Sequence, residues 1–170
     1  MIETVIDRKK IAERISEVGR ELTEFYKGRD FTLVIIANGG VFFGVDLARS
    51  IDLDFSVDVI ATSSYHNDVQ GDDLLFRCGP KLSLEGKNIL LVDEVLDSGV
   101  TLAKTIGKLL QAGAAEVKTA VLVTKERPRP ENAVKAADWS CFTLPDIYLV
   151  GCGLDSHELY RSLPYLGVVK

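Results

Sequence analysis

Hydrophobic residues in this chain gather in short runs that alternate with longer segments of helical spacing. The runs predict strands at 31–36, 54–61, 89–92 and 117–123, with shorter strands near 139–142 and 148–150. A continuous apolar run such as 89–92 is typical of a parallel strand that is buried on both faces. Strands that alternate with helices predict an α/β fold with a doubly wound, mainly parallel sheet.

The helical segments each bury one face. In the first, Asp7 can cap the N-terminus and Gly28 ends the helix; its apolar stripe consists of Ile11, Ile15, Val18, Leu22 and Phe25. Further helices are predicted at 41–50 and 100–111. We expect residues 1–170 to form a single domain. The N-terminal segment with its helix and the residues after about 142 would form a small hood over the strand ends.

Composition excludes several classes of protein. The chain has 170 residues, 46% of them hydrophobic, which is enough for one core. A net charge of −5 without a long basic run argues against nucleic acid or an anionic membrane as a partner. No signal-peptide pattern or membrane-length apolar stretch is visible, so we expect a cytoplasmic protein. The three cysteines lack C-x-x-C spacing and predict free thiols.

The strongest chemical signal follows the strand at 89–92. Asp93 and Glu94 come directly after it, and the loop 97–101 (Asp-Ser-Gly-Val-Thr) leads into the next helix. The carboxyl end of a parallel strand is where open α/β sheets hold ligands. Backbone N–H groups, hydroxyls and a helix N-terminus together suit a phosphate monoester, and adjacent carboxylates suit ribose hydroxyls or Mg²⁺. An acidic turn with a helix cap would explain the apolar run, but not three acids beside a Gly-Thr turn.

This strand, acid pair and loop resemble the phosphoribosyl-pyrophosphate (PRPP) motif of type I phosphoribosyltransferases. Five segments in order are similar to the bacterial type of hypoxanthine–guanine phosphoribosyltransferase: 37–40, 64–65, 93–101, 122–125 and 145–151 with Asp155 and Arg161. The resemblance implies the type I phosphoribosyltransferase fold. It also implies an enzyme of purine salvage that transfers 5-phosphoribosyl from PRPP to N9 of hypoxanthine or guanine, giving IMP or GMP and pyrophosphate.

The resemblance assigns a role to each matching residue. Asp97 would be catalytic, as a general acid/base facing purine N7. The residues that would bind PRPP and its phosphate are Asp93, Glu94, Asp97, Ser98, Gly99, Val100 and Thr101. Those that would bind pyrophosphate are Asn38, Gly39 and Arg161, and Ser64 and Tyr65 would open a flexible loop. The purine would contact Lys125, Tyr148, Leu149 and Asp155. The cofactor would be Mg²⁺, held by Asp93, Glu94 and Asp155.

Two positions depart from the family pattern. Asn38 stands where relatives usually carry Lys or Arg, and the acid pair reads Asp93-Glu94 rather than Glu-Asp. The resemblance also implies a non-proline cis peptide before Asn38. The lost cation would lower PRPP affinity, whereas the backbone N–H groups of the loop would remain.

Other interpretations stay open at this point. Xanthine could be the preferred base, because Lys125 only separates 6-oxopurines from adenine. A non-catalytic nucleotide- or PRPP-binding regulatory protein would explain Asn38 and the exchanged acids, but not the residues that serve pyrophosphate. A sugar-phosphate binder of another kind is a weaker alternative. Taken alone, Lys125 and Arg161 could be surface charges. Apolar residues at 41–43 and on the first helix make a homo-oligomer, a dimer or tetramer, plausible.

Overall fold

The computed structural model describes residues 1–64 and 74–170, and it contains two sheets. The main sheet has six strands in the order β4-β3-β2-β5-β6-β7. Its strands are β2 (Phe31–Ala37), β3 (Ser56–Ser64), β4 (Leu74–Cys78), β5 (Asn88–Leu96), β6 (Glu116–Glu126) and β7 (Trp139–Pro145). All neighbouring pairs run parallel except β3 and β4, which are antiparallel. This confirms the predicted mainly parallel sheet; the edge strand β4 was not predicted.

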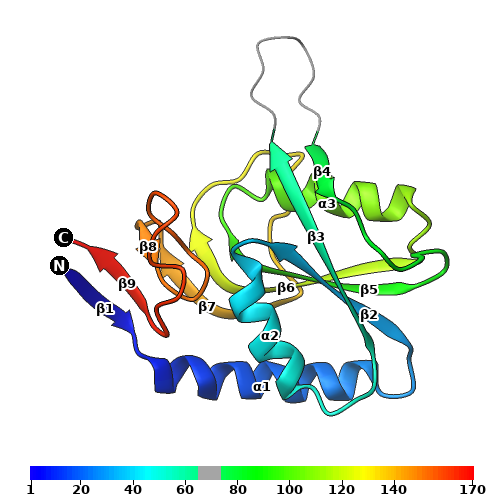
Figure 1. The fold of residues 1–170 in the computed structure, drawn as a ribbon, viewed down its shortest axis with the longest axis horizontal. Helices are drawn as coiled ribbons and strands as arrows, with labels where there is room; N and C mark the ends of the chain where they lie inside the picture. Colours follow the sequence, from blue (N-terminus) through cyan, green and yellow to red (C-terminus); the bar gives the residue numbers. More distant parts are fainter. Residues whose placement is uncertain (65–73) are drawn as a thin grey trace, which may run out of the picture.

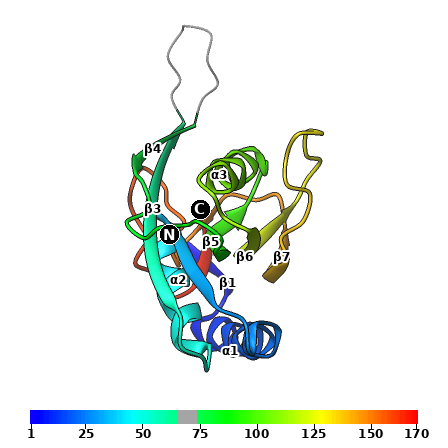
Figure 2. The same ribbon diagram turned by 90° about the vertical axis from the view of Figure 1, so that its right-hand side faces the viewer.

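Helices cover both faces of the main sheet (Figures 1 and 2). On one face lie α1 (Arg8–Tyr26) and α2 (Gly40–Ser50), and on the other lies α3 (Val100–Gln111). Strand β2 shows why both faces are filled. Its Leu33 and Ile35 join the core under α1 and α2, whereas Val34 and Ile36 join the core under α3. Alternate side chains of a strand point to opposite faces, so a continuous apolar run supplies two cores.

Helix α1 begins and ends where the sequence predicts, and its core cluster also includes residues after 142 such as Leu149 and Leu166. The Asp7 carboxylate accepts a hydrogen bond from the Lys10 N–H at 2.9 Å, which caps the helix. Its apolar stripe packs into the core of the main sheet. The stripe ends on Tyr26, which is 1% exposed, rather than on Phe25, which is 37% exposed. Tyr26 lies one helical turn after Leu22, and its ring stacks on that of Phe31 with the ring centroids 4.0 Å apart.

The hood is a separate three-stranded antiparallel sheet in the order β1-β9-β8, together with the loop 151–165. Its strands are β1 (Ile2–Ile6), β8 (Leu149–Val150) and β9 (Leu166–Val169). Strands β1 and β9 were not predicted. Because they pair with each other, the two termini lie side by side (Figure 1). Among the described residues, no helix has the length and apolarity needed to cross a bilayer.

Two strands of the main sheet run further than their apolar cores. Strand β5 continues through the acid pair to Leu96, and β6 continues to Glu126. Lys125 is therefore a strand residue paired with Leu144, beyond the predicted strand at 117–123. Polar residues extend these strands because each finds ladder partners on a neighbouring strand. Tyr65 and the loop that it would open with Ser64 lie outside the described residues.

Candidate active site

A cavity of about 300 Å³ opens at the carboxyl ends of the parallel strands. It is lined by residues of the β2–α2 loop, of β5 and the loop after it, and of the hood. The predicted site residues that it brings together are Asn38, Gly39, Asp93, Glu94, Asp97, Ser98, Gly99, Thr101, Asp155 and Arg161. Val100, Lys125, Tyr148 and Leu149 do not line it. Segments separated by more than one hundred residues thus meet in one polar hollow.

The phosphate loop, residues 97–101, is shaped by its glycine. Gly99 has φ 76°, in the left-handed region that favours glycine. A side chain there would collide with the backbone of Val134, whose N–H donates to the Gly99 carbonyl at 3.1 Å. Helix α3 begins at the next residue, and the Val100 N–H donates to Ser98 Oγ at 3.4 Å. The loop therefore places a helix N-terminus and hydroxyls at the cavity, which suits an anion.

The acid pair lies at the floor of the cavity. The half-buried Asp93 accepts a hydrogen bond from the Glu94 N–H at 2.9 Å. Burial, and next the adjacent charge of Glu94, raise the pKa of Asp93 well above its usual range. The Glu94 carboxylate lies so close to Gly39 that any side chain at position 39 would collide with it. Two crowded carboxyl groups favour a ligand that supplies positive charge or hydroxyl donors.

The loop at 37–40, which we call the pyrophosphate loop after the role that the resemblance implies, leads from β2 into α2. The peptide bond between Ala37 and Asn38 is cis, as the resemblance implied. Asn38 is exposed, whereas Gly39 and Gly40 are buried against the acid pair. Helix α2 begins at Gly40, so a second helix N-terminus lies at the cavity. Gly153 of the hood packs against the Gly39 carbonyl, which leaves no room for a side chain at position 153.

Arg161 reaches into the cavity from the hood loop. Its Nη1 donates to the Gly153 carbonyl at 2.7 Å, and its Nη2 lies 2.9 Å from the Asp155 carboxylate. The Nε atom is buried without a partner among the described residues. Asp155 also accepts a hydrogen bond from the Glu158 N–H at 2.8 Å, so both of its oxygens are engaged. A metal ion at Asp155 would have to compete with Arg161.

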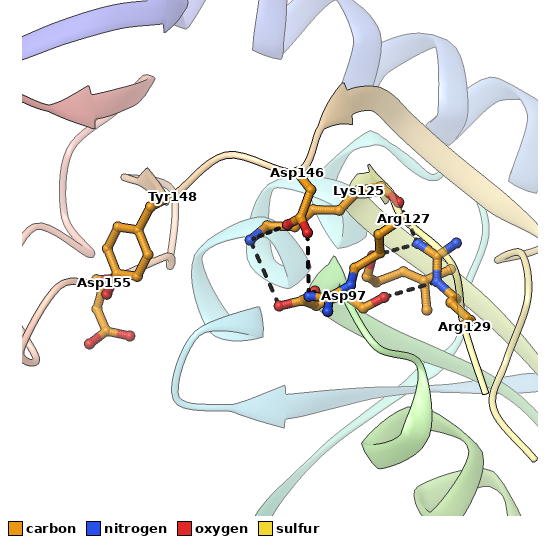
Figure 3. A network of polar contacts seen from close by, with 8 residues as sticks. Asp97, Lys125, Arg127, Arg129, Asp146, Tyr148 and Asp155 are labelled. Carbon is orange, nitrogen blue, oxygen red and sulfur yellow. Dashed lines mark hydrogen bonds and ion pairs between the residues drawn. The ribbon is translucent and has the colours of Figure 1, made fainter.

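Asp97 takes part in a ring of four alternating charges with Lys125, Arg127 and Asp146 (Figure 3). Arg127 Nη1 donates to Asp97 Oδ1 at 2.6 Å and lies 3.6 Å from Asp146 Oδ2. Lys125 Nζ lies 3.7 Å from Asp97 Oδ2 and 3.6 Å from Asp146 Oδ1. We call these four residues the charge ring. Lys125 therefore stands beside Asp97, as their roles by resemblance require.

Sequence reasoning missed Arg127, Arg129 and Asp146. Arg129 donates to the backbone carbonyls of Leu96, Asp97, Lys125 and Lys135 at 3.1, 2.9, 2.6 and 3.2 Å. It thereby ties the end of β5 to the end of β6. One signal was available in the sequence: Lys125 and Arg127 are two residues apart, a spacing that puts both side chains on one face of an extended segment. The contribution of Asp146 depends on the β6–β7 register and was not readable.

The remaining predicted purine contacts lie on the hood side. Tyr148 is 61% exposed, and its hydroxyl donates to the Asp155 carbonyl at 3.0 Å. Figure 3 shows Tyr148 and Asp155 standing apart from the charge ring. Leu149 is buried in β8, so only its backbone could meet a ligand. Ser64 ends β3 at the same edge of the sheet.

Comparisons with known proteins agree on one family. The family described as phosphoribosyl transferase domain matches residues 2–157. The hypoxanthine-guanine phosphoribosyltransferase of Dictyostelium discoideum is 36% identical, over 99% of this chain and 95% of that protein. The bifunctional protein TilS/HprT of Listeria innocua is 35% identical over 98% of this chain, which spans only 26% of that protein. A crystal structure of a hypoxanthine phosphoribosyltransferase from Staphylococcus aureus has 31% identity and a TM-score of 0.91, covering 99% of this chain and 91% of that one.

Proposed function

Because this chain belongs to the hypoxanthine–guanine phosphoribosyltransferase family, we propose that it transfers 5-phosphoribosyl from PRPP to N9 of a 6-oxopurine. Hypoxanthine and guanine are the proposed bases, and IMP and GMP the products of purine salvage. The observation that carries the proposal is the cavity at the strand ends. It combines two helix N-termini with the acid pair and Asp97, and thus offers anion sites on both sides of a sugar site.

The proposed reaction forms the bond from the anomeric carbon to N9 and breaks the bond to pyrophosphate. Positive charge develops on the ribose and negative charge on the leaving pyrophosphate. The phosphate loop would hold the 5-phosphate, while N–H groups of the pyrophosphate loop and Arg161 would receive the leaving group. Asp97 would hold or take a proton at purine N7. Asp93 and Glu94 would orient the ribose hydroxyls.

We propose Mg²⁺ as the cofactor, with Asp93 and Glu94 as its protein ligands. The described residues contain no group of three or more acidic, His or Cys side chains that could hold a metal. A pair of carboxylates still fits, because Mg²⁺ is usually held by one or two carboxylates together with substrate oxygens and water. Bound there, the ion would neutralise charge on the leaving pyrophosphate. A second ion at Asp155 would require Arg161 to turn toward pyrophosphate.

The proposed base site lies between the charge ring and Tyr148. The Lys125 ammonium would donate to the 6-oxo group, and Tyr148 would stack on the ring. The backbone near Leu149 and Asp155 would contact the 2-position. Ser64 and Tyr65 would begin a segment that closes over the reaction. For Lys125 to reach a purine, its contacts with Asp97 and Asp146 have to open.

We further propose one catalytic domain over residues 1–170 that works as a homo-oligomer. An apolar hollow of about 300 Å³ between α1, α2 and the hood loop supports this proposal. Its lining is mainly apolar and includes Ile11, Val41, Phe42 and Pro164, and Phe42 is 41% exposed.

We also propose that the protein works in the cytoplasm. The free thiols Cys78, Cys141 and Cys152 agree with a reducing compartment.

The test is to incubate purified protein with PRPP, Mg²⁺ and one of hypoxanthine, guanine, xanthine or adenine, and to measure the nucleotide formed. We expect turnover with hypoxanthine and guanine and little with adenine. Higher kcat/KM for xanthine would make the protein xanthine-preferring. Binding of PRPP without turnover on any base would instead support a regulatory binding protein.

A further inference from the structure

We propose that Arg127 is a positioning residue for the reaction: it holds Asp97 and Asp146 in place when Lys125 turns from them to the purine. This inference rests on the proposed function, which uses Asp97 and Lys125 but gives Arg127 no role. It starts from the charge ring, in which each carboxylate faces both cations.

The two cations of the ring are held differently. Lys125 Nζ lies 3.7 and 3.6 Å from its two carboxylates, beyond ordinary hydrogen-bond length. Arg127 donates to Asp97 at 2.6 Å, a short charge-assisted hydrogen bond. The Lys125 side chain is 12% exposed, whereas that of Arg127 is 38% exposed. Lys125 is thus the less exposed and loosely held member that can leave, and Arg127, hydrogen-bonded to Asp97, is the member that remains bound.

When Lys125 leaves, two carboxylates remain that both faced it, and like charges at close range repel. Arg127 already holds Asp97 through Nη1, and the same nitrogen faces Asp146 at 3.6 Å. A guanidinium presents several donors in a planar fork, so it can bind two carboxylates at once. It would therefore keep Asp97 aimed at the base, while Lys125 donates to the 6-oxo group.

The frame behind the ring is rigid enough for this exchange. Lys125 lies in β6, and Arg127 follows one residue after its end. Pro128 fixes the next φ angle, and Arg129 ties the Lys125 carbonyl to those of Leu96 and Asp97. The ends of β5 and β6 therefore cannot drift apart when Lys125 moves. A surface ion pair without this role would not affect the reaction.

The test compares Arg127→Ala and Arg127→Lys with a matched control, Arg29→Ala. Arg29 pairs with Glu116 at 2.8 Å, and its side chain is 39% exposed, close to the 38% of Arg127. It lies near the amino ends of the parallel strands, far from the site. We expect Arg127→Ala to lower kcat/KM for hypoxanthine and guanine roughly tenfold, the low end for a lost charged hydrogen bond. KM for PRPP should stay within about twofold, because the hydroxyls and the helix N-terminus at the phosphate site are unchanged. Arg127→Lys should recover part of the loss, since it restores charge without the fork.

A double-mutant cycle with Asp146→Asn completes the experiment. If Arg127 and Asp146 act together, the second substitution should cost less in the Arg127→Ala background than in the wild type. If Arg127→Ala and Arg29→Ala have the same kcat/KM for the purine, the inference about Arg127 is wrong, while the proposed function stands. The inference is also wrong if Arg127→Ala lowers kcat/KM for PRPP and for the purine equally and lowers Tm as well, because Arg127 would then have only a structural role. A wild type inactive with all four bases overturns the proposed function and the inference with it.

Discussion

The phosphate loop and the charge ring stand side by side in the site but are built in opposite ways. The loop is set by backbone: a left-handed glycine, a carbonyl held by Val134, and a helix that starts at the next residue. The ring is set by side-chain charges, three of which are about 40% exposed. A backbone site is ready before its ligand arrives, whereas a ring of ion pairs has to rearrange to admit one.

This difference fits what each region would bind. The 5-phosphate is the same in every reaction cycle, so a fixed anion site suits it. The purine has to exchange proton and hydrogen bonds with groups that, without a base, neutralise each other. Substitutions in the loop should therefore change PRPP affinity and stability, and substitutions in the ring should change use of the base. The following predictions test that division.

The largest effect is expected at Asp97, which belongs to both regions. Asp97→Asn should lower kcat by about 10²–10⁴, the usual range for a general acid/base, and leave KM for PRPP within a few-fold. Steady-state kinetics with hypoxanthine would measure this. Glu116→Gln, which removes a carboxylate paired with Arg29 far from the site, should leave kcat unchanged. A folded Asp97→Asn variant with near-native kcat would refute the assignment.

The second-largest effect is expected from Gly99→Ala, which changes the backbone conformation of the phosphate loop. A left-handed non-glycine residue and a collision with Val134 should cost about 1–3 kcal/mol of unfolding free energy. KM for PRPP should also rise in this variant. Denaturant unfolding and PRPP titration would measure both. Gly107→Ala, inside α3 and with open space around it, should instead stabilise the protein by up to about 1 kcal/mol. Equal stability of the two variants would contradict the loop geometry.

Lys125→Ala removes the less exposed cation of the charge ring. We expect kcat/KM for 6-oxopurines to fall about 10- to 100-fold, as for a lost hydrogen bond to a charged group, and the gap to adenine to narrow. Lys118→Ala, in the same strand but at its other end, is the control. If Lys125→Ala used every 6-oxopurine as well as the wild type does, Lys125 would be a structural ion pair only.

The smallest effect is expected from Asn38→Lys in the pyrophosphate loop. A restored cation should lower KM for PRPP and leave kcat within a few-fold, because the backbone groups already present carry most of the binding. The gain should shrink as salt is added, since an exposed charge is screened within about 10 Å at 0.1 M ionic strength. Kinetics at two salt concentrations would show this, with Asn38→Gln as the uncharged control. A gain that salt leaves unchanged would mean that the charge is not the cause.

Much of the architecture was predictable because it depends on local pattern. The buried runs located the central strands, and α3 spans Val100–Gln111 as its spacing predicts. Strands β1 and β9 were missed because they pair with each other from opposite ends of the chain, which no local pattern reveals. The packing partners of α1 were not readable for a related reason, since an amphipathic stripe shows that one face is buried but not against which residues.

The site residues also fall into those that the sequence predicted and those that only the structure revealed. The sequence by itself determined the acid pair, Asp97, the Gly-Thr loop and the family resemblance, because those residues are contiguous and their chemistry follows from spacing. Only the tertiary structure decided that Asp155 is paired with Arg161 and that Lys125 ends a strand beside Asp97. It alone joined Arg127 and Asp146 into a ring. Charged side chains on different strands meet through the register of the sheet, and register is set by the packing of the whole core.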